Sequence, residues 1–376
     1  MALFHSTIGI ANTIRIPQIL EQVKRGDEPS GQYTTTPISY LSTTEAERAG
    51  QAQGCLWDHY RYAMAAGQPV KAAENMTSEG AVKFNNREDI IQLTPLWKGE
   101  RFDDGRPRVP DDILRRMEKV RCEEAWAVLW REGYHFQFEG NWTNFHPNRT
   151  LVGRAVTGVF VPHRPDLHDY LMQYGHEQEG RIGAMNSWVI ETLRKDDVIV
   201  IDLFGKVYEG TYSGANLSTA IATRTQRGQV IYGGVRDAEQ ILEIENLVTF
   251  CKGVDPTPIR NVTLVGMNVP CRIGNAICMP GDVVLGNYTG VLFIPPHLAE
   301  AVVEHSERTR LREIFSHMRL RQGIYNSSQM DTKWTEEIEA DFEAWRQTHT
   351  LEELEGIDWD KEEKGGAQEG EETLLG

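Results

Sequence analysis

The chain of 376 residues carries 39 Lys and Arg against 55 Asp and Glu, which gives a formal net charge of -16. Because a nucleic acid backbone is bound by clustered Lys and Arg, this charge excludes nucleic acid as an expected partner. Hydrophobic content of 40% and charged content of 25% are normal for a soluble globular protein. No apolar run reaches the roughly 18 residues needed to cross a membrane.

The cysteines and the N-terminus bear on the compartment. Five cysteines, an odd number, show no C-x-x-C spacing, which argues against a disulfide framework or a structural zinc site. The first residues lack the basic stretch and the long apolar run of a secretory signal. We therefore expect a cytoplasmic protein without a membrane segment.

Residues 1–85 form a predicted N-terminal extension. A helix is expected from Thr44 through Ala66, and the segment contains no catalytic pattern. Its expected role is either an arm that packs on a neighbouring subunit or an extension of the substrate pocket.

Residues 86–330 form the predicted catalytic domain. A strong helix is expected between Pro110 and Gly133, since Pro favours a helix start and Gly a helix end. Its apolar positions fall mostly on one face, as for core packing; they are Ile113, Leu114, Met117, Val120, Ala125, Val128 and Leu129. The segment Tyr134–Phe138 then alternates like a strand.

The central part of the chain predicts a strand, helix, strand unit. Val198–Asp202 has the apolar character of a buried strand. Gly214–Ala220 is typical of a turn that opens a helix. A second strand, Val230–Tyr232, leads to the adjacent residues Arg236 and Asp237.

The C-terminal third is predicted to change character twice. Short strands with Gly and Pro turns are expected from Pro258 to Pro295, and a charged helix from about Leu298 to Arg321. A C-terminal helix is expected over residues 331–351. Residues 352–376, rich in Glu, Asp and Gly, predict an acidic disordered tail.

Chemistry is expected at the end of the second central strand. Arg236 can bind a carboxylate with its planar fork, and Asp237 is a hard oxygen ligand suited to Mg²⁺ or Mn²⁺. A helix N-terminus with unpaired amides can receive a substrate carboxylate; the amides expected to do so belong to Gly214, Ala215, Asn216 and Leu217. The simpler alternative for Arg236 and Asp237 is a local ion pair at a turn. Asp202 is either a ligand acting through water or a capping residue in a turn.

Several motifs in order resemble the RraA-like proteins, a family that includes class II 4-hydroxy-4-methyl-2-oxoglutarate aldolases and oxaloacetate decarboxylases. The resemblance covers roughly Leu151 to Gly323. It rests on segments similar to the family's G-x-A-x-T, G-D-V-x-V-x-D, G-x-x-L and G-x-R-D motifs and on a later Pro-Gly-Asp segment. These are Gly153–Thr157, Asp196–Asp202, Gly214–Leu217, Gly234–Asp237 and Pro280–Val284.

This resemblance implies an α/β fold with an RraA-like β/β/α sandwich core and C-terminal helices. It also implies a homotrimer or a dimer of trimers with active sites between subunits. In the family a glutamate from the C-terminal region enters a neighbour's active site. The spacing before Gly323 favours Glu313 for that catalytic role, with Glu307 as the alternative.

The implied function is that of a divalent-metal-dependent lyase acting on a small anionic substrate, a 2-oxo acid or a sugar-derived acid. Retro-aldol cleavage, decarboxylation and dehydration share a metal-stabilised enolate and differ in what leaves. The insertion from His163 to Trp188 and the N-terminal extension suggest a larger or more polar substrate than pyruvate aldols. Within the insertion, His163, His168 and His176 are either acid or base groups or surface and packing residues. The rival hypothesis is a non-catalytic RraA-like regulatory protein that binds another protein.

Overall fold

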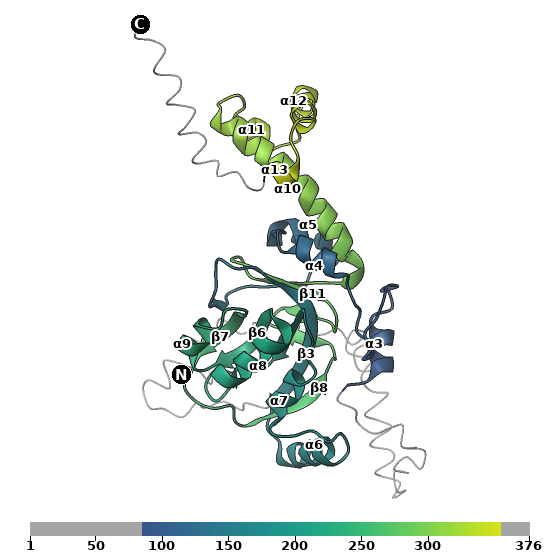
Figure 1. Cartoon of the computed structure of the whole chain (residues 1–376), viewed down its shortest axis with the longest axis vertical. Helices are drawn as coiled ribbons and strands as arrows, with labels where there is room; N and C mark the ends of the chain where they lie inside the picture. The colour runs from purple at the N-terminus through teal and green to yellow at the C-terminus, as the bar shows by residue number, and fades with distance from the viewer. Residues whose placement is uncertain (1–84, 355–376) are drawn as a thin grey trace, which may run out of the picture. The chain divides into compact units, whose positions relative to one another are not determined.

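The structure of the chain is a computed structural model that describes residues 85–354 (Figure 1). The predicted N-terminal extension, apart from its last residue, lies outside the described residues, and so does its helix over residues 44–66. The predicted acidic tail lies outside them from residue 355 onward. No helix within residues 85–354 is both long enough and apolar enough to span a membrane.

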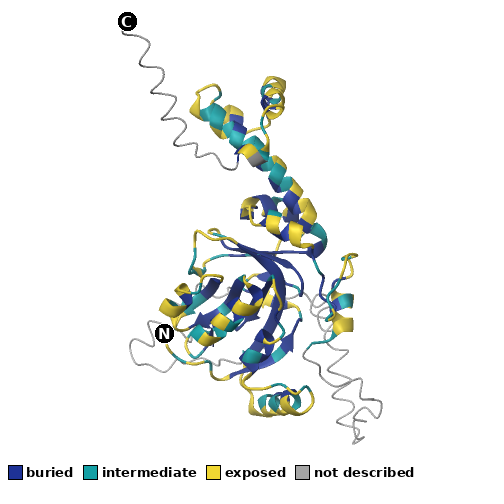
Figure 2. Cartoon of the chain, in the orientation of Figure 1, coloured by how far each residue is buried: buried dark blue, intermediate teal, exposed yellow. Residues whose placement is uncertain are grey.

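A ten-stranded sheet organises the domain. Its centre consists of four parallel neighbours: β3 (Leu151–Pro162), β4 (Asp197–Asp202), β6 (Gly228–Val235) and β7 (Val248–Val254). Strands β3, β4 and β6 are almost wholly buried (Figure 2), and β7 is buried over its first four residues. Their Val and Ile content is typical of strands covered on both faces. The predicted strand, helix, strand unit is confirmed, because β4 and β6 pair in parallel on either side of a helical crossover.

Shorter strands extend this centre and curl it. They are β1 (Phe138–Glu139), β2 (Thr143–Asn144), β5 (Thr211–Ser213), β8 (Val262–Met267), β11 (Val283–Gly286) and β12 (Val291–Ile294). The long strand β3 pairs with β11 through its first residues and with β8 through its last, with a register shift at Val159 and Phe160. That irregularity bends the strand and allows the sheet to curl. A separate hairpin joins β9 (Cys271–Ile273) to β10 (Ala276–Cys278).

The layers follow the expected β/β/α order. Four helices cover one face of the parallel strands: α6 (Pro165–Glu177), α7 (Met185–Ile190), α8 (Ala215–Thr225) and α9 (Ala238–Leu242). Alternate residues of β4 divide between the faces, so that Ile199 and Ile201 pack under the helices while Val198 and Val200 face the hairpin and β11–β12. This alternation confirms an α/β fold with a β/β/α sandwich core.

One helix prediction needs correction. The segment between Pro110 and Gly133 forms two helices, α4 (Asp111–Met117) and α5 (Cys122–Arg131). The chain turns between them because the Glu124 carboxylate accepts the backbone N–H of Arg121 (2.9 Å) and the hydroxyl of Ser306 (2.6 Å), which starts a new helix. The predicted apolar positions are all buried, so the core-packing interpretation is confirmed.

The strand predicted at Tyr134–Phe138 is wrong for most of its length. Only Phe138 belongs to a strand, β1, which pairs with β12. The preceding residues still make single backbone bonds, since the carbonyl of Phe136 accepts from Ile277 and that of Gln137 from Phe293. Successive carbonyl groups of this segment therefore bond to two different strands, β10 and β12, and no regular ladder forms.

The remaining helices lie at the two ends of the described chain. They are α3 (Arg87–Leu93), η4 (Pro296–Leu298), α10 (Ala299–Arg321), α11 (Ser327–Met330), α12 (Glu336–Arg346) and α13 (Leu351–Leu354). The predicted helix from about Leu298 to Arg321 is confirmed by α10, whose first half packs on α4 and α5. Its second half packs with α11–α13 in a small aromatic core around Phe315 and Trp334.

Candidate active site

The predicted site residues lie where parallel strands end. The carboxyl ends of β4, β5 and β6 share one edge of the sheet, and α8 begins directly after β5. Crevices at this edge are the usual ligand sites of open parallel sheets. The structure therefore brings Gly214, the start of α8, to Arg236 and Asp237, which follow β6.

The backbone fixes the direction of the two charged side chains. The N–H of Arg236 donates to the carbonyl of Ser213 (3.0 Å), which ties the end of β6 to the residue before α8. Asp237 takes the left-handed conformation, with φ of 56° and ψ of 41°. Asp is among the few residues that tolerate this conformation. As a result its side chain does not cap α9, although Asp237 is the N-cap residue.

The Asp237 carboxylate contacts the next helix instead. Its Oδ2 atom accepts the backbone N–H of Ala215, the first residue of α8, at 3.0 Å. A carboxylate at this position is stabilised by the positive end of the helix dipole. The other oxygen, Oδ1, has no hydrogen-bonding partner within residues 85–354, so it can accept a cation or a water.

Gly214 is required at this contact because of space rather than backbone freedom. A Cβ atom placed on it would lie 2.4 Å from Asp237 Oδ2 and 2.9 Å from Arg236 Nε. Any larger residue would therefore displace the arginine, the aspartate or both. The glycine of the G-x-x-L segment is explained by this close approach.

The ion-pair alternative accounts for little of the geometry. Arg236 Nε and Asp237 Oδ2 are 4.0 Å apart, and the side chains are 44% and 37% exposed. Exposed pairs at that separation contribute at most about 1 kcal/mol. The terminal nitrogens of Arg236 have no partner among the described residues, so its fork is available to an anion.

The start of α8 offers fewer free amides than the sequence predicts. Ser218 donates to the Gly214 carbonyl, and the amide of Ala215 is already engaged by Asp237. The N-cap residue, Gly214, has no side chain that could occupy the next amides. The N–H groups of Asn216 and Leu217 are the predicted donors that remain for a substrate carboxylate.

The donor set fits a hydrated hard cation. The part of the chain that the structure describes contains no group of three or more His, Cys, Asp or Glu that could hold a metal ion. A zinc site, which needs three or four nitrogen or sulfur ligands, is not built here. Mg²⁺ and Mn²⁺ accept a single carboxylate oxygen together with several waters, and Asp237 Oδ1 is such an oxygen.

Two nearby carboxylates serve turns. Asp202 Oδ1 accepts the N–H of Phe204 (2.8 Å), which supports the turn interpretation of Asp202; burial raises the pKa of this carboxyl. Asp255 Oδ1 accepts the N–H of Thr257 (2.9 Å), and the hydroxyl and backbone of Thr257 lower the pKa of Asp255. Both follow the pattern of short polar side chains that stabilise turns.

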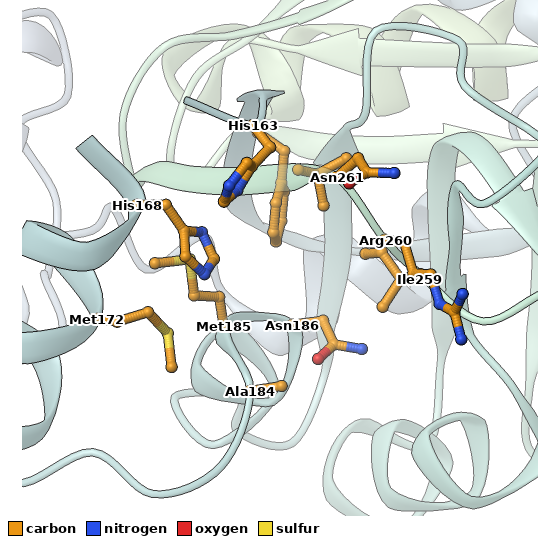
Figure 3. Close-up of a pocket in the computed structure, with 11 residues that line it drawn as sticks. His163, His168, Met172, Ala184, Met185, Asn186, Ile259, Arg260 and Asn261 are labelled. Carbon is orange, nitrogen blue, oxygen red and sulfur yellow. The ribbon is translucent and has the colours of Figure 1, made fainter. Parts of the chain in front are cut away.

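A pocket of about 320 Å³ lies at the end of the neighbouring strand β3, between α6, α7 and the segment before β8 (Figure 3). His163 and His168 lie next to one another in its wall, with ring centroids 4.6 Å apart. Nδ1 of His168 is 3.1 Å from the Thr263 hydroxyl. Burial and the neighbouring His163 lower the pKa of His168, which favours its neutral form.

Asn186 links this pocket to the predicted site. It lines the pocket, and its side-chain amide donates to the carbonyl of Tyr212 (3.0 Å), two residues before Gly214. The Tyr212 hydroxyl donates back to the Asn186 carbonyl (2.8 Å). The insertion therefore supports β5, the strand that leads into α8.

The third histidine of the insertion has a different role. His176 is exposed and does not line the pocket; its Nδ1 lies 2.8 Å from the Arg181 carbonyl. Its ring packs edge-on against Trp188 at 5.6 Å between centroids. For His176 the packing interpretation is supported.

Sequence reasoning missed Asn186 and Arg260, which also lines the pocket. The available signal for Asn186 was a polar residue between Met185 and Trp188 in an apolar helix turn. For Arg260 there was none, because only the folded chain brings the segment before β8 against α7.

The glutamates of α10 are paired with other helices of the same chain. Glu313 Oε2 lies 2.6 Å from Arg121 Nη1, and Glu307 makes two bonds of 2.7 Å to Arg116. Within one chain their charges are thus directed at α4 and α5. A catalytic role for Glu313 stays a prediction that depends on a neighbouring subunit.

Residues 128–293 match the family described as RraA-like (Aldolase/RraA), which confirms the resemblance seen in the motifs. The protein DlpA of Legionella pneumophila is 31% identical over 146 residues, covering 38% of this chain and 23% of DlpA. A protein of Halalkalibacterium halodurans, provisionally named 4-hydroxy-4-methyl-2-oxoglutarate aldolase, is 30% identical over 112 residues, 30% of this chain and 52% of that protein. The chain thus spans about a quarter of the first relative and half of the other.

Among solved structures, RraAS2 of Streptomyces coelicolor, described as an unusual member of the RNase ES inhibitor RraA protein family, superposes with a TM-score of 0.48 and 24% identity. The superposition covers 57% of this chain and 98% of that one.

Proposed function

Because residues 128–293 carry an RraA-like domain, we propose that this chain is a divalent-metal-dependent lyase acting on a 2-oxo acid or a sugar-derived acid. The observation that carries the proposal is the contact between the end of β6 and the start of α8. There an arginine with a free fork lies beside an aspartate with a free oxygen, next to free helix amides. A chelating substrate with a carboxylate beside a carbonyl or hydroxyl group matches these three elements.

The residues of the chain have distinct roles in the proposal. Arg236 binds the substrate carboxylate or the oxygen on which negative charge develops, and its two parallel N–H groups hold that oxygen in place. The N–H groups of Asn216 and Leu217 hold the remaining carboxylate oxygen. Asp237 would hold the divalent ion through Oδ1, while the N–H of Ala215 orients the Asp237 carboxylate through Oδ2. When bound, Mg²⁺ or Mn²⁺ supplies a positive charge that stabilises electrons left on the carbon next to the carbonyl.

Proton transfer requires a group outside this junction. In retro-aldol cleavage the substrate hydroxyl loses a proton as the carbon–carbon bond breaks, and the adjacent carbon later gains one. We assign this role to Glu313 of a neighbouring subunit in a homotrimer or dimer of trimers. The assignment requires that Glu313 release Arg121, its partner within the chain.

The pocket of Figure 3 favours the longer substrates in this class. Arg260 places a positively charged group in its wall, beside the imidazole rings of His163 and His168. Asn186 connects the pocket to β5, the strand before α8. Dehydration of a sugar acid, whose hydroxyl-bearing chain needs polar walls, is therefore the variant we place first, ahead of aldol cleavage and decarboxylation of short acids.

The experiment is a substrate screen. Purified protein with Mg²⁺ or Mn²⁺ is incubated with aldonic acids, 4-hydroxy-2-oxo acids and oxaloacetate, and 2-oxo products are followed by a coupled assay. The Arg236→Lys variant is the matched control. Turnover by the wild type that the variant lacks supports the proposal, and equal turnover of both overturns it.

The non-catalytic regulatory alternative predicts a different result. A binding protein needs neither a free arginine fork nor a metal, so Asp237→Asn would leave its partner binding unchanged. Absence of turnover on all three substrate classes, together with unchanged thermal stability when Mg²⁺ or Mn²⁺ is added, would favour that reading.

A further inference from the structure

A second cavity lies away from the strand ends that form the candidate active site. Its volume is about 270 Å³. Its walls come from the end of α3 and the segment after it, the chain between α5 and β1, strand β10, the turn before β11, and η4. Most of the lining is apolar, including Trp97, Ile277 and Pro295. Small-molecule sites usually combine such apolar walls with a few convergent polar groups.

Asp282 is the central polar group of this cavity. Asp282 as a whole is only 1% exposed to solvent. One carboxylate oxygen, Oδ2, accepts the N–H of Met279 (2.8 Å). Within residues 85–354 the bond from Met279 is the only hydrogen bond to this carboxylate, and Asp282 takes part in no ion pair. A buried carboxylate without a cation is costly, so the site lacks the positive charge that would stabilise it.

Two further polar groups converge on the same space. The Tyr134 hydroxyl and His297 Nε2 are 3.2 Å apart, and both residues line the cavity. Burial and, to a smaller extent, the charge of Asp282 raise the pKa of Tyr134, while burial lowers the pKa of His297. Neutral tyrosine and neutral imidazole beside a carboxyl group offer acceptors for the N–H groups of a ligand.

The rim of the cavity is reachable from solvent. Leu93, Leu96 and Ile277 border it and are 44%, 57% and 43% exposed. Exposed large apolar side chains grouped around an opening are typical of a ligand site rather than of a packing defect. The aromatic face of Trp97 in the wall is also suited to a cation.

We propose that this cavity binds a small organic amine with an aromatic or aliphatic body, whose ammonium group pairs with Asp282 and donates to Tyr134 or His297. The body of the ligand packs against Trp97 and Ile277. An anionic ligand would meet the charge of Asp282, and a neutral alcohol would leave that charge without a partner. The inference is independent of the lyase proposal, because it uses none of the residues assigned to that reaction.

The test is calorimetric titration of the full chain at pH 8, where Asp282 is ionised, with benzylamine, benzyl alcohol and phenylacetate, three probes of similar shape and different charge. Benzylamine is expected to bind at least tenfold more tightly than the alcohol, and phenylacetate not measurably. The Asp282→Asn variant is expected to lose at least tenfold in benzylamine affinity. The control variant, Asp169→Asn, changes an exposed aspartate and is expected to bind as the wild type does.

A second variant covers the case in which Asp282→Asn does not fold. Ile277→Lys places an ammonium group at the exposed rim, where it can pair with Asp282 and compete with the probe. Benzylamine binding is then expected to disappear while the fold is kept. Equal affinity for benzylamine and benzyl alcohol, or unchanged benzylamine affinity in either variant, would overturn the proposal.

Discussion

Asp237 and Asp282 make similar contacts in opposite surroundings. Each carboxylate accepts one backbone N–H, from Ala215 and Met279, and each has one oxygen without a partner in the described part of the chain. Asp237 is 37% exposed beside Arg236 and a helix N-terminus, whereas Asp282 is buried and has no cation. The environment, rather than the type of side chain, therefore determines what each aspartate can bind.

The largest expected effect is metal removal at Asp237. Chelation with EDTA is expected to abolish turnover, and Mg²⁺ or Mn²⁺ to restore it, because the single carboxylate holds the ion weakly. Asp237→Asn is expected to lose metal affinity, measured by calorimetry, while its circular dichroism spectrum stays native. Full activity of metal-free protein would contradict the proposed role of Asp237.

The next effect concerns the pH dependence of stability at Asp282. Burial raises the pKa of Asp282 from 3.8 to about 7. The folded protein therefore keeps a proton that the unfolded chain releases above about pH 4. Stability from this group is complete below pH 4 and is lost as the pH rises to 7, by on the order of 4 kcal/mol.

Urea unfolding between pH 4 and pH 8 measures how the free energy of unfolding depends on pH, for the wild type and for Asp282→Asn. The wild type is expected to lose free energy of unfolding relative to the variant as the pH rises. The groups near Asp282 that also titrate, Cys278, Tyr134 and His297, are unchanged in the variant. Parallel pH profiles would show that Asp282 is ionised in the folded state.

Arg236→Lys is expected to lower kcat/KM on the order of 10²-fold, because lysine keeps the charge but cannot form two parallel bonds to one carboxylate. Steady-state kinetics measures the loss. Arg224→Lys, at an exposed ion pair on α8, is the matched control and is expected to be neutral. Activity within twofold of wild type for Arg236→Lys would favour the ion-pair interpretation.

Gly214→Ala is expected to lower kcat/KM on the order of 10-fold, because the added methyl group displaces Asp237 or Arg236. Gly140→Ala is the control, since its Cβ would meet only the ring of Phe138, at 3.4 Å. The kcat/KM values of the two variants are compared at a temperature at which thermal unfolding shows both to be folded. A neutral result for Gly214→Ala would mean that the close contact is relaxed in solution.

The smallest expected effect is on stability at Glu313. Its pair with Arg121 is partly exposed, so Glu313→Gln is expected to cost under about 1 kcal/mol in urea unfolding. Activity separates its two possible roles. Mixing inactive Arg236→Lys with inactive Glu313→Gln protein is expected to restore turnover if neighbouring subunits share a site. No recovery after verified subunit exchange would place Glu313 outside the shared site.

Much of the fold was predictable because it depends on local signals. Val198–Asp202 and Val230–Tyr232 are apolar, β-branched runs, and β4 and β6 contain them. The turn at Gly214 opens α8 as predicted. The helix predicted after Pro110 is in fact two helices. Glu124 caps the second one through the N–H of Arg121, and the hydroxyl of Ser306, distant in sequence, donates to the same carboxylate.

Local sequence patterns predicted the central strands, the start of α8 and the residues that follow the strand ends, since periodicity and turn chemistry act between near neighbours. They thereby placed Arg236 and Asp237 at a strand end. Only the tertiary structure decided that Asp237 engages Ala215 rather than its own helix, and that Asp282 is buried without a cation. These outcomes depend on which distant segments pack together, and that choice is made by the whole core rather than by any local pattern.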